Sequence, residues 1–262
     1  MKLCTVLENT TAREDLIPEH GLSLYVETGS RKILFDTGQS GLYWDNAARM
    51  GLDLAQVDTA VLSHGHYDHG GGLVRFLRGN ARARVYVSSL AFGSYYHGPE
   101  KYIGLPPVLR DDPRLTAVDR TLSLGDGLTL YPDIPLRDPV NSWGLQKQQD
   151  GRLVPDDFRH EQYLLLEEGG KRILFSGCSH RGILNIARHF RPDVLIGGFH
   201  FMKLDPQTRE GRTALTQAAE SLLALPCVYY TCHCTGIPQY EFLKTILGDR
   251  LHYLATGSRL TL

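Results

Sequence analysis

The chain has 262 residues, with 28 Lys and Arg against 29 Asp and Glu and a formal net charge of −1. This balance argues against the broad basic surface of a nucleic-acid-binding protein and against attachment to an anionic membrane. The apolar runs are too short for a signal peptide or a membrane span, and five cysteines without framework spacing indicate reduced thiols. We therefore expect a single cytoplasmic domain, residues 1–262, that acts on a small molecule.

The first half of the chain alternates predicted strands and helices. Residues 25–38, YVETGSRKILFDTG, form two apolar runs around a glycine-containing turn, which is typical of a β-hairpin. The elements expected after it are a helix at 41–50 and strands at 57–64, 84–88 and 121–131. Residues 95–113 are rich in Gly, Pro and Tyr, and they predict a long irregular loop of the kind that often binds ligands.

The second half repeats this order. Residues 163–177, YLLLEEGGKRILFSG, resemble residues 25–38 and predict a second hairpin. The elements expected after it are helices at 182–190, 214–225 and 237–247, and strands at 193–200, 227–231 and 251–254. Because hairpins and helices alternate in both halves, we expect an α/β (α+β) fold of two packed sheets covered by helices, not a doubly wound parallel sheet.

The most specific motif is LSHGHYDHGGG at residues 62–72. It places His64, His66, Asp68 and His69 within six residues, directly after a predicted apolar strand. Imidazole and carboxylate are good ligands for zinc and other divalent first-row metals. Four such ligands exceed the three that one catalytic zinc takes from a protein. The motif therefore predicts a pair of metal ions.

The pattern His-x-His-x-Asp-His resembles the signature of the metallo-β-lactamase superfamily. The segment ILFDTG at 33–38 also resembles the early Asp-containing turn of that superfamily. The resemblance extends over nearly the whole chain. It implies a four-layer αββα sandwich with a two-metal site at the sheet edge, in which Asp36 supports the metal loop from behind. It also accounts for the internal repeat, since that fold is built of two similar halves.

The resemblance implies further ligands in the second half. His233 follows the strand expected at 227–231 and matches the superfamily's last histidine. Cys178 stands where many relatives carry an Asp that bridges both metals; it is either a thiolate ligand or a small buried side chain. His180 is expected as the third imidazole of the first metal, with His160 as the weaker alternative. Softer ligands favour two zinc ions, with manganese or iron as alternatives.

Five further residues are candidates for substrate contact: Glu19, His20, Tyr67, Arg181 and His200. Arg181 could pair with a phosphate or carboxylate through its planar fork. His200 follows its strand as His64 follows the corresponding strand of the first half. The alternatives are that Arg181 is a solvated surface residue and that His200 is a buried histidine with its hydrogen bonds satisfied.

Two cysteines, Cys232 and Cys234, flank His233. A separate structural zinc at this place would need more ligands than the local sequence offers. We interpret both cysteines as packing residues, with a redox function as the minor alternative.

These features together predict a metal-dependent hydrolase in which the metals activate water and Asp68 both binds a metal and orients the nucleophile. One branch of the superfamily resembles this chain at residues 19–23, 64–73, 176–183, 197–200 and 233–236. That branch includes archaeal 7,8-dihydropterin-6-methyl-4-(β-D-ribofuranosyl)aminobenzene-5'-phosphate synthases, so a carbon–carbon coupling synthase is the alternative. A non-catalytic metal or ligand sensor is a third hypothesis, and a diiron oxygen-reducing role ranks below it. The oligomeric state is left open.

Overall fold

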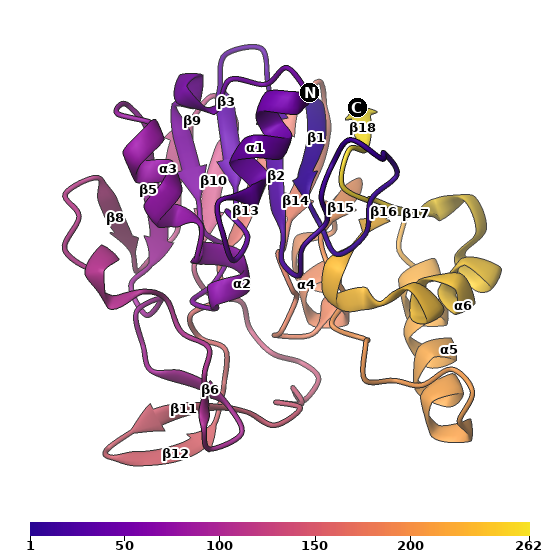
Figure 1. Cartoon of the computed structure of the whole chain (residues 1–262). Helices are drawn as coiled ribbons and strands as arrows, with labels where there is room; N and C mark the ends of the chain where they lie inside the picture. Colours follow the sequence, from indigo (N-terminus) through magenta and orange to yellow (C-terminus); the bar gives the residue numbers. More distant parts are fainter.

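Two seven-stranded sheets form the centre of the molecule in the computed structural model, which describes residues 1–262 (Figure 1). The first sheet contains, in spatial order, β18 (Arg259–Thr261), β1 (Lys2–Leu7), β2 (Ser23–Glu27), β3 (Lys32–Phe35), β4 (Thr59–Val61), β5 (Arg84–Ser88) and β8 (Leu115–Val118). The second contains β17 (Leu251–Tyr253), β16 (Val228–Thr231), β15 (Val194–Ile196), β14 (Lys171–Phe175), β13 (Tyr163–Glu168), β10 (Leu128–Tyr131) and β9 (Leu122–Gly125).

The two sheets share one plan, which confirms the internal repeat. In each sheet an antiparallel hairpin, β2–β3 or β13–β14, leads into three parallel strands. The helices are α1 (Leu42–Arg49), α2 (Tyr67–Gly70), α3 (Leu73–Gly79), α4 (Ile183–Phe190), α5 (Arg209–Leu223) and α6 (Ile237–Leu247). Short 3₁₀ turns are η1 (Leu54–Gln56), η2 (Pro107–Leu109), η3 (His233–Thr235) and η4 (Gly248–Arg250). None of the helices has the length and apolar character needed to cross a membrane.

Alternation along the strands divides the buried side chains into three layers. In β3, Ile33 and Phe35 contribute to the core between the sheets, whereas Leu34 faces the core beneath α1 and α3. In β13, Leu164 joins the core between the sheets and Leu165 the core beneath α4, α5 and α6. Because successive strand residues point to opposite faces, each sheet is apolar on both sides. The four-layer αββα sandwich expected from the sequence is confirmed.

The core between the sheets offers a direct test of this packing. The rings of Phe35 and Phe175, one from each sheet, have centroids 5.5 Å apart, and both residues are 0% exposed. We expect Phe175→Ala to lower the free energy of unfolding by about 3–5 kcal/mol, because it leaves a cavity between the sheets. Urea denaturation measures the change. Val108→Ala is the control, since Val108 is 80% exposed and should change stability by less than about 0.5 kcal/mol. Equal losses in the two variants would contradict this packing.

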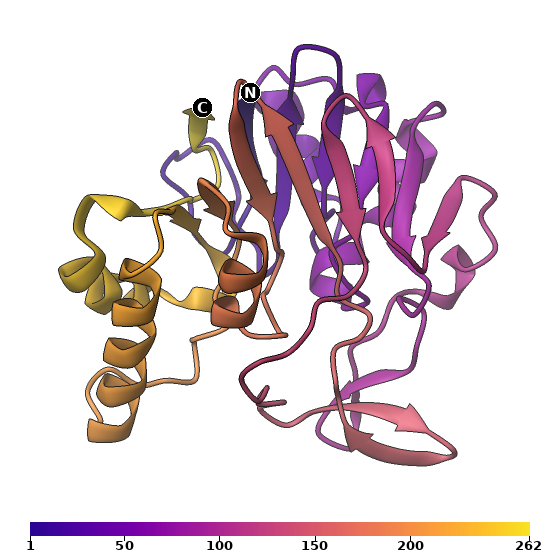
Figure 2. The same cartoon turned by 180° about the vertical axis from the view of Figure 1, so that it is seen from behind.

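A third, four-stranded sheet was not expected from the sequence. It contains β12 (Arg152–Pro155), β11 (Leu145–Gln149), β6 (Tyr95–His97) and β7 (Lys101–Tyr102), and it lies below the main sheets in Figures 1 and 2. The prediction of an irregular loop at 95–113 is therefore wrong over β6 and β7. These strands are two or three residues long, and β6 pairs with β11 from far along the chain. The sheet joins a segment of the first half to a segment of the second.

Two other element boundaries differ from the sequence-based prediction. The single strand expected at 121–131 is an antiparallel pair, β9 and β10, because Gly125 and Gly127 adopt φ of +80° and +76° at a tight turn. Helix α5 begins five residues before the helix expected at 214–225. Its start is set by the Thr208 hydroxyl, which accepts a hydrogen bond from the Gly211 amide at 3.1 Å.

Strand direction brings the chemistry-bearing residues together. His64 follows β4, Cys178 follows β14, His200 follows β15 and His233 follows β16. These four strands belong to the parallel parts of the two sheets. Since parallel strands end at the same sheet edge, their following loops meet at one end of the sandwich.

Candidate metal centre

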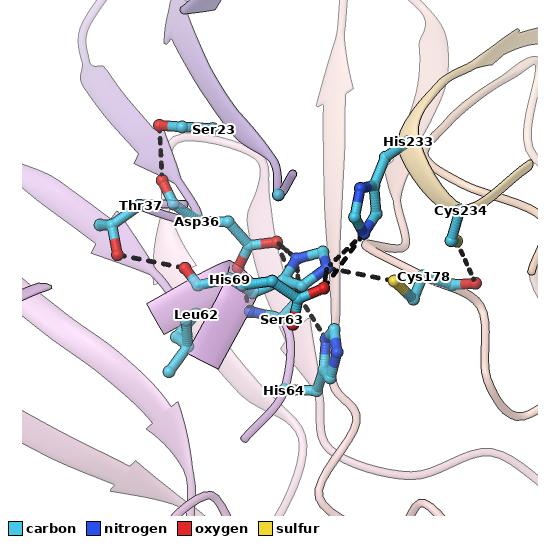
Figure 3. A network of polar contacts seen from close by, with 12 residues as sticks. Ser23, Asp36, Thr37, Leu62, Ser63, His64, His69, Cys178, His233 and Cys234 are labelled. Atoms are coloured by element: carbon cyan, nitrogen blue, oxygen red, sulfur yellow. Dashed lines mark hydrogen bonds and ion pairs between the residues drawn. The ribbon is translucent and has the colours of Figure 1, made fainter. Parts of the chain in front are cut away.

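The loops at this edge bring five side chains within ligand distance of one another. His69 Nε2 lies 3.1 Å from Cys178 Sγ and 3.2 Å from His233 Nε2, as Figure 3 shows. His64 Nε2 lies 3.3 Å from His180 Nε2. These residues fall into two groups, His64–Cys178–His180 and His69–Cys178–His233, and the possible ligand atoms of each group lie within 4.8 Å of one another. Cys178 belongs to both groups, and all five residues are buried.

Asp36 orients two of the three histidines of the metal loop, His64 and His69. Its Oδ2 lies 2.6 Å from His69 Nδ1 and accepts the Ser63 hydroxyl at 2.7 Å. The Ser63 oxygen then accepts from His64 Nδ1, 2.8 Å away. With Nδ1 acting as donor in both rings, the Nε2 lone pairs of His64 and His69 point into the centre. Asp36 thus lies behind the loop, in the position expected from the sequence (Figure 3).

His233 is oriented in the same way by the N-terminal segment. Asn9 Oδ1 lies 2.8 Å from His233 Nδ1, so this nitrogen donates outward and Nε2 faces the centre. Glu8 Oε1 accepts the backbone N–H of His233 at 2.6 Å, and the Glu8 side chain is fully buried. Glu8 and Asn9 were not identified from the sequence. The signal that could have identified them is a pair of polar residues directly after the apolar strand β1.

The separations between the facing nitrogens fit a bound metal. The Nε2 atoms of His69 and His233 are 3.2 Å apart, and those of His64 and His180 are 3.3 Å apart. A tetrahedral metal with bonds of about 2.0–2.1 Å to nitrogen places its ligands about 3.3 Å apart. The histidines that face one another across the centre therefore suit a first-row divalent metal.

The charge states of the ligands support this fit. Burial, followed by the neighbouring imidazoles, holds the pKa of His64 and of His180 well below the usual range, so both are neutral. Burial opposes protonation of His69, but Asp36 raises the pKa of His69 to about 9. Burial also opposes ionisation of Asp68, yet its histidine neighbours hold the pKa of that carboxyl well below its usual range. Metal binding thus displaces one proton from His69 and none from His64, His180 or Asp68.

Asp68 lies on the side of the centre that faces solvent. Its Oδ2 is 3.4 Å from His233 Nε2, 4.0 Å from His69 Nε2 and 3.2 Å from His20 Nε2. The Asp68 side chain is 14% exposed, whereas that of His69 is fully buried. Asp68 is therefore the carboxylate that can reach both the second ligand group and a bound molecule.

The structure separates the two candidates for the third imidazole. His160 Nδ1 accepts the Gly65 amide at 2.9 Å, and its Nε2 lies 3.0 Å from Asp156 Oδ2. Both nitrogens of His160 are thus engaged in holding the loop. His180 faces the centre, and the Nε2 of His66 is buried without a hydrogen-bond partner. His180 thus belongs to the group with His64 and Cys178, whereas His160 belongs to a separate group with His66 and Asp156.

A buried glutamate holds the loop that carries His180. Glu161 accepts the backbone N–H of His180 at 2.7 Å and that of Arg181 at 3.0 Å. Glu161 is 0% exposed and was not identified from the sequence. It supports His180 through the backbone, as Glu8 supports His233.

A cavity of about 410 Å³ opens onto the centre. Of the residues expected to contact substrate, His20, Tyr67 and His200 line it. The third sheet and its connections form the opposite wall, which contains His97, Lys101, Ile103, Trp143 and Leu145. A small molecule in this cavity would contact both the candidate ligands and residues from the third sheet.

Glu19 and Arg181 do not line this cavity. The Arg181 guanidinium pairs with Asp133 at 2.7 Å and donates to the Ile134 carbonyl at 2.8 Å. The Glu19 carboxylate accepts the Ser40 hydroxyl at 2.8 Å. Both side chains are already engaged by neighbouring loops, so each has a structural role here.

The two cysteines interpreted as packing residues differ in the structure. Cys232 packs into the core between the sheets, as expected. Cys234 instead lines the cavity, and its Sγ belongs to a group of possible ligand atoms with Cys178 and His200. The η3 turn at His233–Thr235 directs the two thiols to opposite sides.

A larger cavity, of about 500 Å³, lies on the far side of Tyr95 and His160. The rings of these two residues have centroids 3.9 Å apart and form part of its wall. Of the candidate metal ligands, this cavity is lined only by His160, the weaker alternative, so it does not open onto the two groups that share Cys178.

Comparisons with known proteins agree with this geometry. The family model described as the metallo-beta-lactamase superfamily matches residues 16–223. An uncharacterized protein of Methanocaldococcus jannaschii is 27% identical over 206 residues, which cover 75% of this chain and 78% of that protein. The 7,8-dihydropterin-6-methyl-4-(beta-D-ribofuranosyl)-aminobenzene-5'-phosphate synthase of the same organism is 28% identical over 265 residues, which cover 89% of this chain and 88% of the synthase.

Solved structures give the same result. The crystal structure of Tm1679, described as a metal-dependent hydrolase of the beta-lactamase superfamily, matches with a TM-score of 0.84 and 27% identity over 100% of this chain and 99% of that one. Zn²⁺-bound PqqB from Methylobacterium extorquens shares the fold, with a TM-score of 0.61 and 14% identity over 100% of both chains.

Proposed function

The chain belongs to the metallo-β-lactamase superfamily, and on this premise we propose that it is a hydrolase that uses two divalent metal ions, Zn²⁺ above Mn²⁺ or Fe²⁺. The observation that carries the proposal is the meeting of two ligand groups at Cys178 beside an open cavity. The proposed ligands are His64, His66 and His180 for one metal, Asp68, His69 and His233 for the other, and Cys178 between them. Imidazole and thiolate ligands favour zinc.

The residues at the cavity face suit hydrolysis. Metals bound here would supply Lewis-acid activation of water and of the bond to be cleaved. Asp68 is ionised and partly exposed, so its carboxylate can accept a hydrogen bond from the attacking water and orient it. His20 Nε2 lies 3.2 Å from Asp68 and its side chain is 49% exposed, which places it to pass a proton between this carboxylate and a leaving group.

The cavity wall favours a small anionic substrate with an apolar body. Lys101 lies over the Tyr67 ring, 5.5 Å from its centroid, and Lys203 donates to the Trp143 carbonyl at 2.5 Å. Asp68 is the one acidic residue among those that line the cavity. Two lysines that face apolar side chains favour a molecule carrying a phosphate or carboxylate group.

Metal removal tests the proposal. We expect the purified chain to contain at least two zinc ions, to lose hydrolysis of a phosphodiester, lactone or thioester on complete chelation, and to regain it with added Zn²⁺. His233→Ala should lower the metal content, whereas His189→Ala, which changes an exposed histidine on α4, should not. Elemental analysis and the three substrate panels give the readouts. Unchanged turnover in fully chelated protein would refute the mechanism.

A dihydropterin-dependent synthase is the second candidate. It is favoured by the similarity to the named synthase over 89% of this chain, and by an aromatic and basic cavity wall. Binding of a dihydropterin, followed by pterin fluorescence, would support it, and failure to bind would count against it. The open cavity beside the ligands disfavours the alternative of a non-catalytic sensor.

A further inference from the structure

A third group of soft ligand atoms adjoins the proposed metal pair. The Sγ atoms of Cys178 and Cys234 and one ring nitrogen of His200 lie within 4.8 Å of one another. Both cysteines are free thiols, and Cys234 Sγ lies 3.4 Å from the carbonyl oxygen of Cys178. Neither His200 nor Cys234 belongs to the two groups centred on the metal loop.

Like His66 and His180 of the proposed pair, His200 has one buried ring nitrogen without a hydrogen-bond partner. Its Nδ1 is buried and has no hydrogen-bond partner. Its backbone is in the left-handed region, with φ of +58°, and its ring centroid is 4.3 Å from that of His180. Leaving a buried polar nitrogen without a partner costs free energy, so its position beside two thiols points to a missing ligand.

The backbone around Cys234 leaves its thiol open toward the cavity. A Cβ atom at Gly198 would collide with Cys234 Sγ, so only glycine permits the chain to pass this close to the sulfur. Cys178, His200 and Cys234 all line the 410 Å³ cavity. The three ligand atoms are therefore enclosed by backbone on one side and reachable from the cavity on the other.

We propose that Cys178, Cys234 and His200 form a third metal subsite, which takes a thiophilic cation such as Zn²⁺. Two sulfurs and one imidazole nitrogen are a recognised set for zinc, and three protein ligands leave a fourth position open to the cavity. Both cysteines would bind the metal as thiolates, and any thiol proton displaced on binding goes to solvent. The subsite depends on the proposed metal pair only through the shared thiol of Cys178.

Cadmium titration of the metal-free full-length chain tests this subsite, because cadmium–thiolate bonds absorb in the ultraviolet. We expect the wild-type chain to bind about three Cd²⁺, and Cys234→Ala to bind about two with roughly half of the thiolate absorbance. His200→Ala should also lose the third ion. Cys232→Ala is the matched control, since this thiol flanks His233 on the other side and packs into the core. It should behave as wild type.

A second measurement needs no variant at Cys234. Alkylation followed by mass spectrometry should show Cys234 protected in the wild-type chain at three equivalents of Cd²⁺. In His64→Ala, which disturbs the proposed pair alone, Cys234 should still become protected, so the two proposals can fail separately. Three results would overturn the subsite. The first is that Cys234→Ala and the wild-type chain bind the same number of Cd²⁺ ions. The others are that Cys234 stays open to alkylation, or that Cys178 and Cys234 form a disulfide in place of metal binding.

Discussion

Cys178→Ala is expected to reduce kcat/KM by more than about 100-fold, beyond the 10–100-fold typical of losing an outer partner of a ligand. The thiol of Cys178 is shared by both ligand groups of the proposed pair, so its loss weakens both metals together. Burial raises the pKa of this thiol well above its usual range, so without metal it is a neutral buried group. Its place at the centre is therefore explained best by metal binding.

Cys178→Asp is the informative companion. A carboxylate restores the ligand that many relatives of this superfamily carry at the corresponding place, and it is harder than a thiolate. We expect this variant to keep the metal pair and to shift its preference from zinc toward manganese. Metal content and kcat/KM measured with each metal report the shift. Cys227→Ala, a buried cysteine beside β16, is the control, and an alanine variant at 178 with kcat/KM within about tenfold of wild type would contradict a shared ligand.

Asp36→Asn is expected to lower metal affinity by about 10–100-fold and the free energy of unfolding by about 3–5 kcal/mol. Asp36 is 0% exposed and accepts hydrogen bonds from the Ser63 amide, the Ser63 hydroxyl and His69 Nδ1. Asparagine tolerates the local φ of +61° and keeps one acceptor oxygen. Its NH₂ group, however, faces donors, and the charge that fixes the His69 tautomer is lost.

The effect of this substitution on metal-free protein should depend on pH. Asp36 raises the pKa of His69 from 6.5 to about 9, so the pair stabilises the folded state fully below pH 6.5. That stabilisation is lost as pH rises through 9. Urea denaturation at pH 6 and pH 10 should therefore show the larger loss at pH 6. Asp126→Asn is the control, because its pairing with Arg31 is exposed and contributes less than about 1 kcal/mol. A loss independent of pH would contradict the pairing.

The parts of the fold that were predicted correctly depend on patterns of residues that are close together in the sequence. The hairpins at β2–β3 and β13–β14 each have apolar runs on both sides of a glycine turn, and the sandwich followed from finding this unit twice. The loop of His64, His66, Asp68 and His69 was recognisable because all four candidate ligands lie within six residues.

The parts that were missed depend on distant partners. The strands β6 and β11 are short, and they become strands by pairing with each other across about 50 residues. The burial of Arg181 against Asp133 and the position of Glu8 behind His233 likewise join segments that are far apart in the chain. The place of Cys234 at the cavity was not predicted, because the sequence does not show that Cys232 packs into the core while Cys234 lines the cavity.

The small sheet also suggests how this architecture can change during evolution. Its strands come from two excursions, one between β5 and β8 and one between β10 and β13, and neither excursion carries a ligand proposed for the metal pair. Changes in these excursions can therefore alter which molecule the cavity binds, while the segments that carry the proposed metal ligands stay unchanged. Because β6 pairs with β11, the two excursions must diversify together, as one interlocked unit.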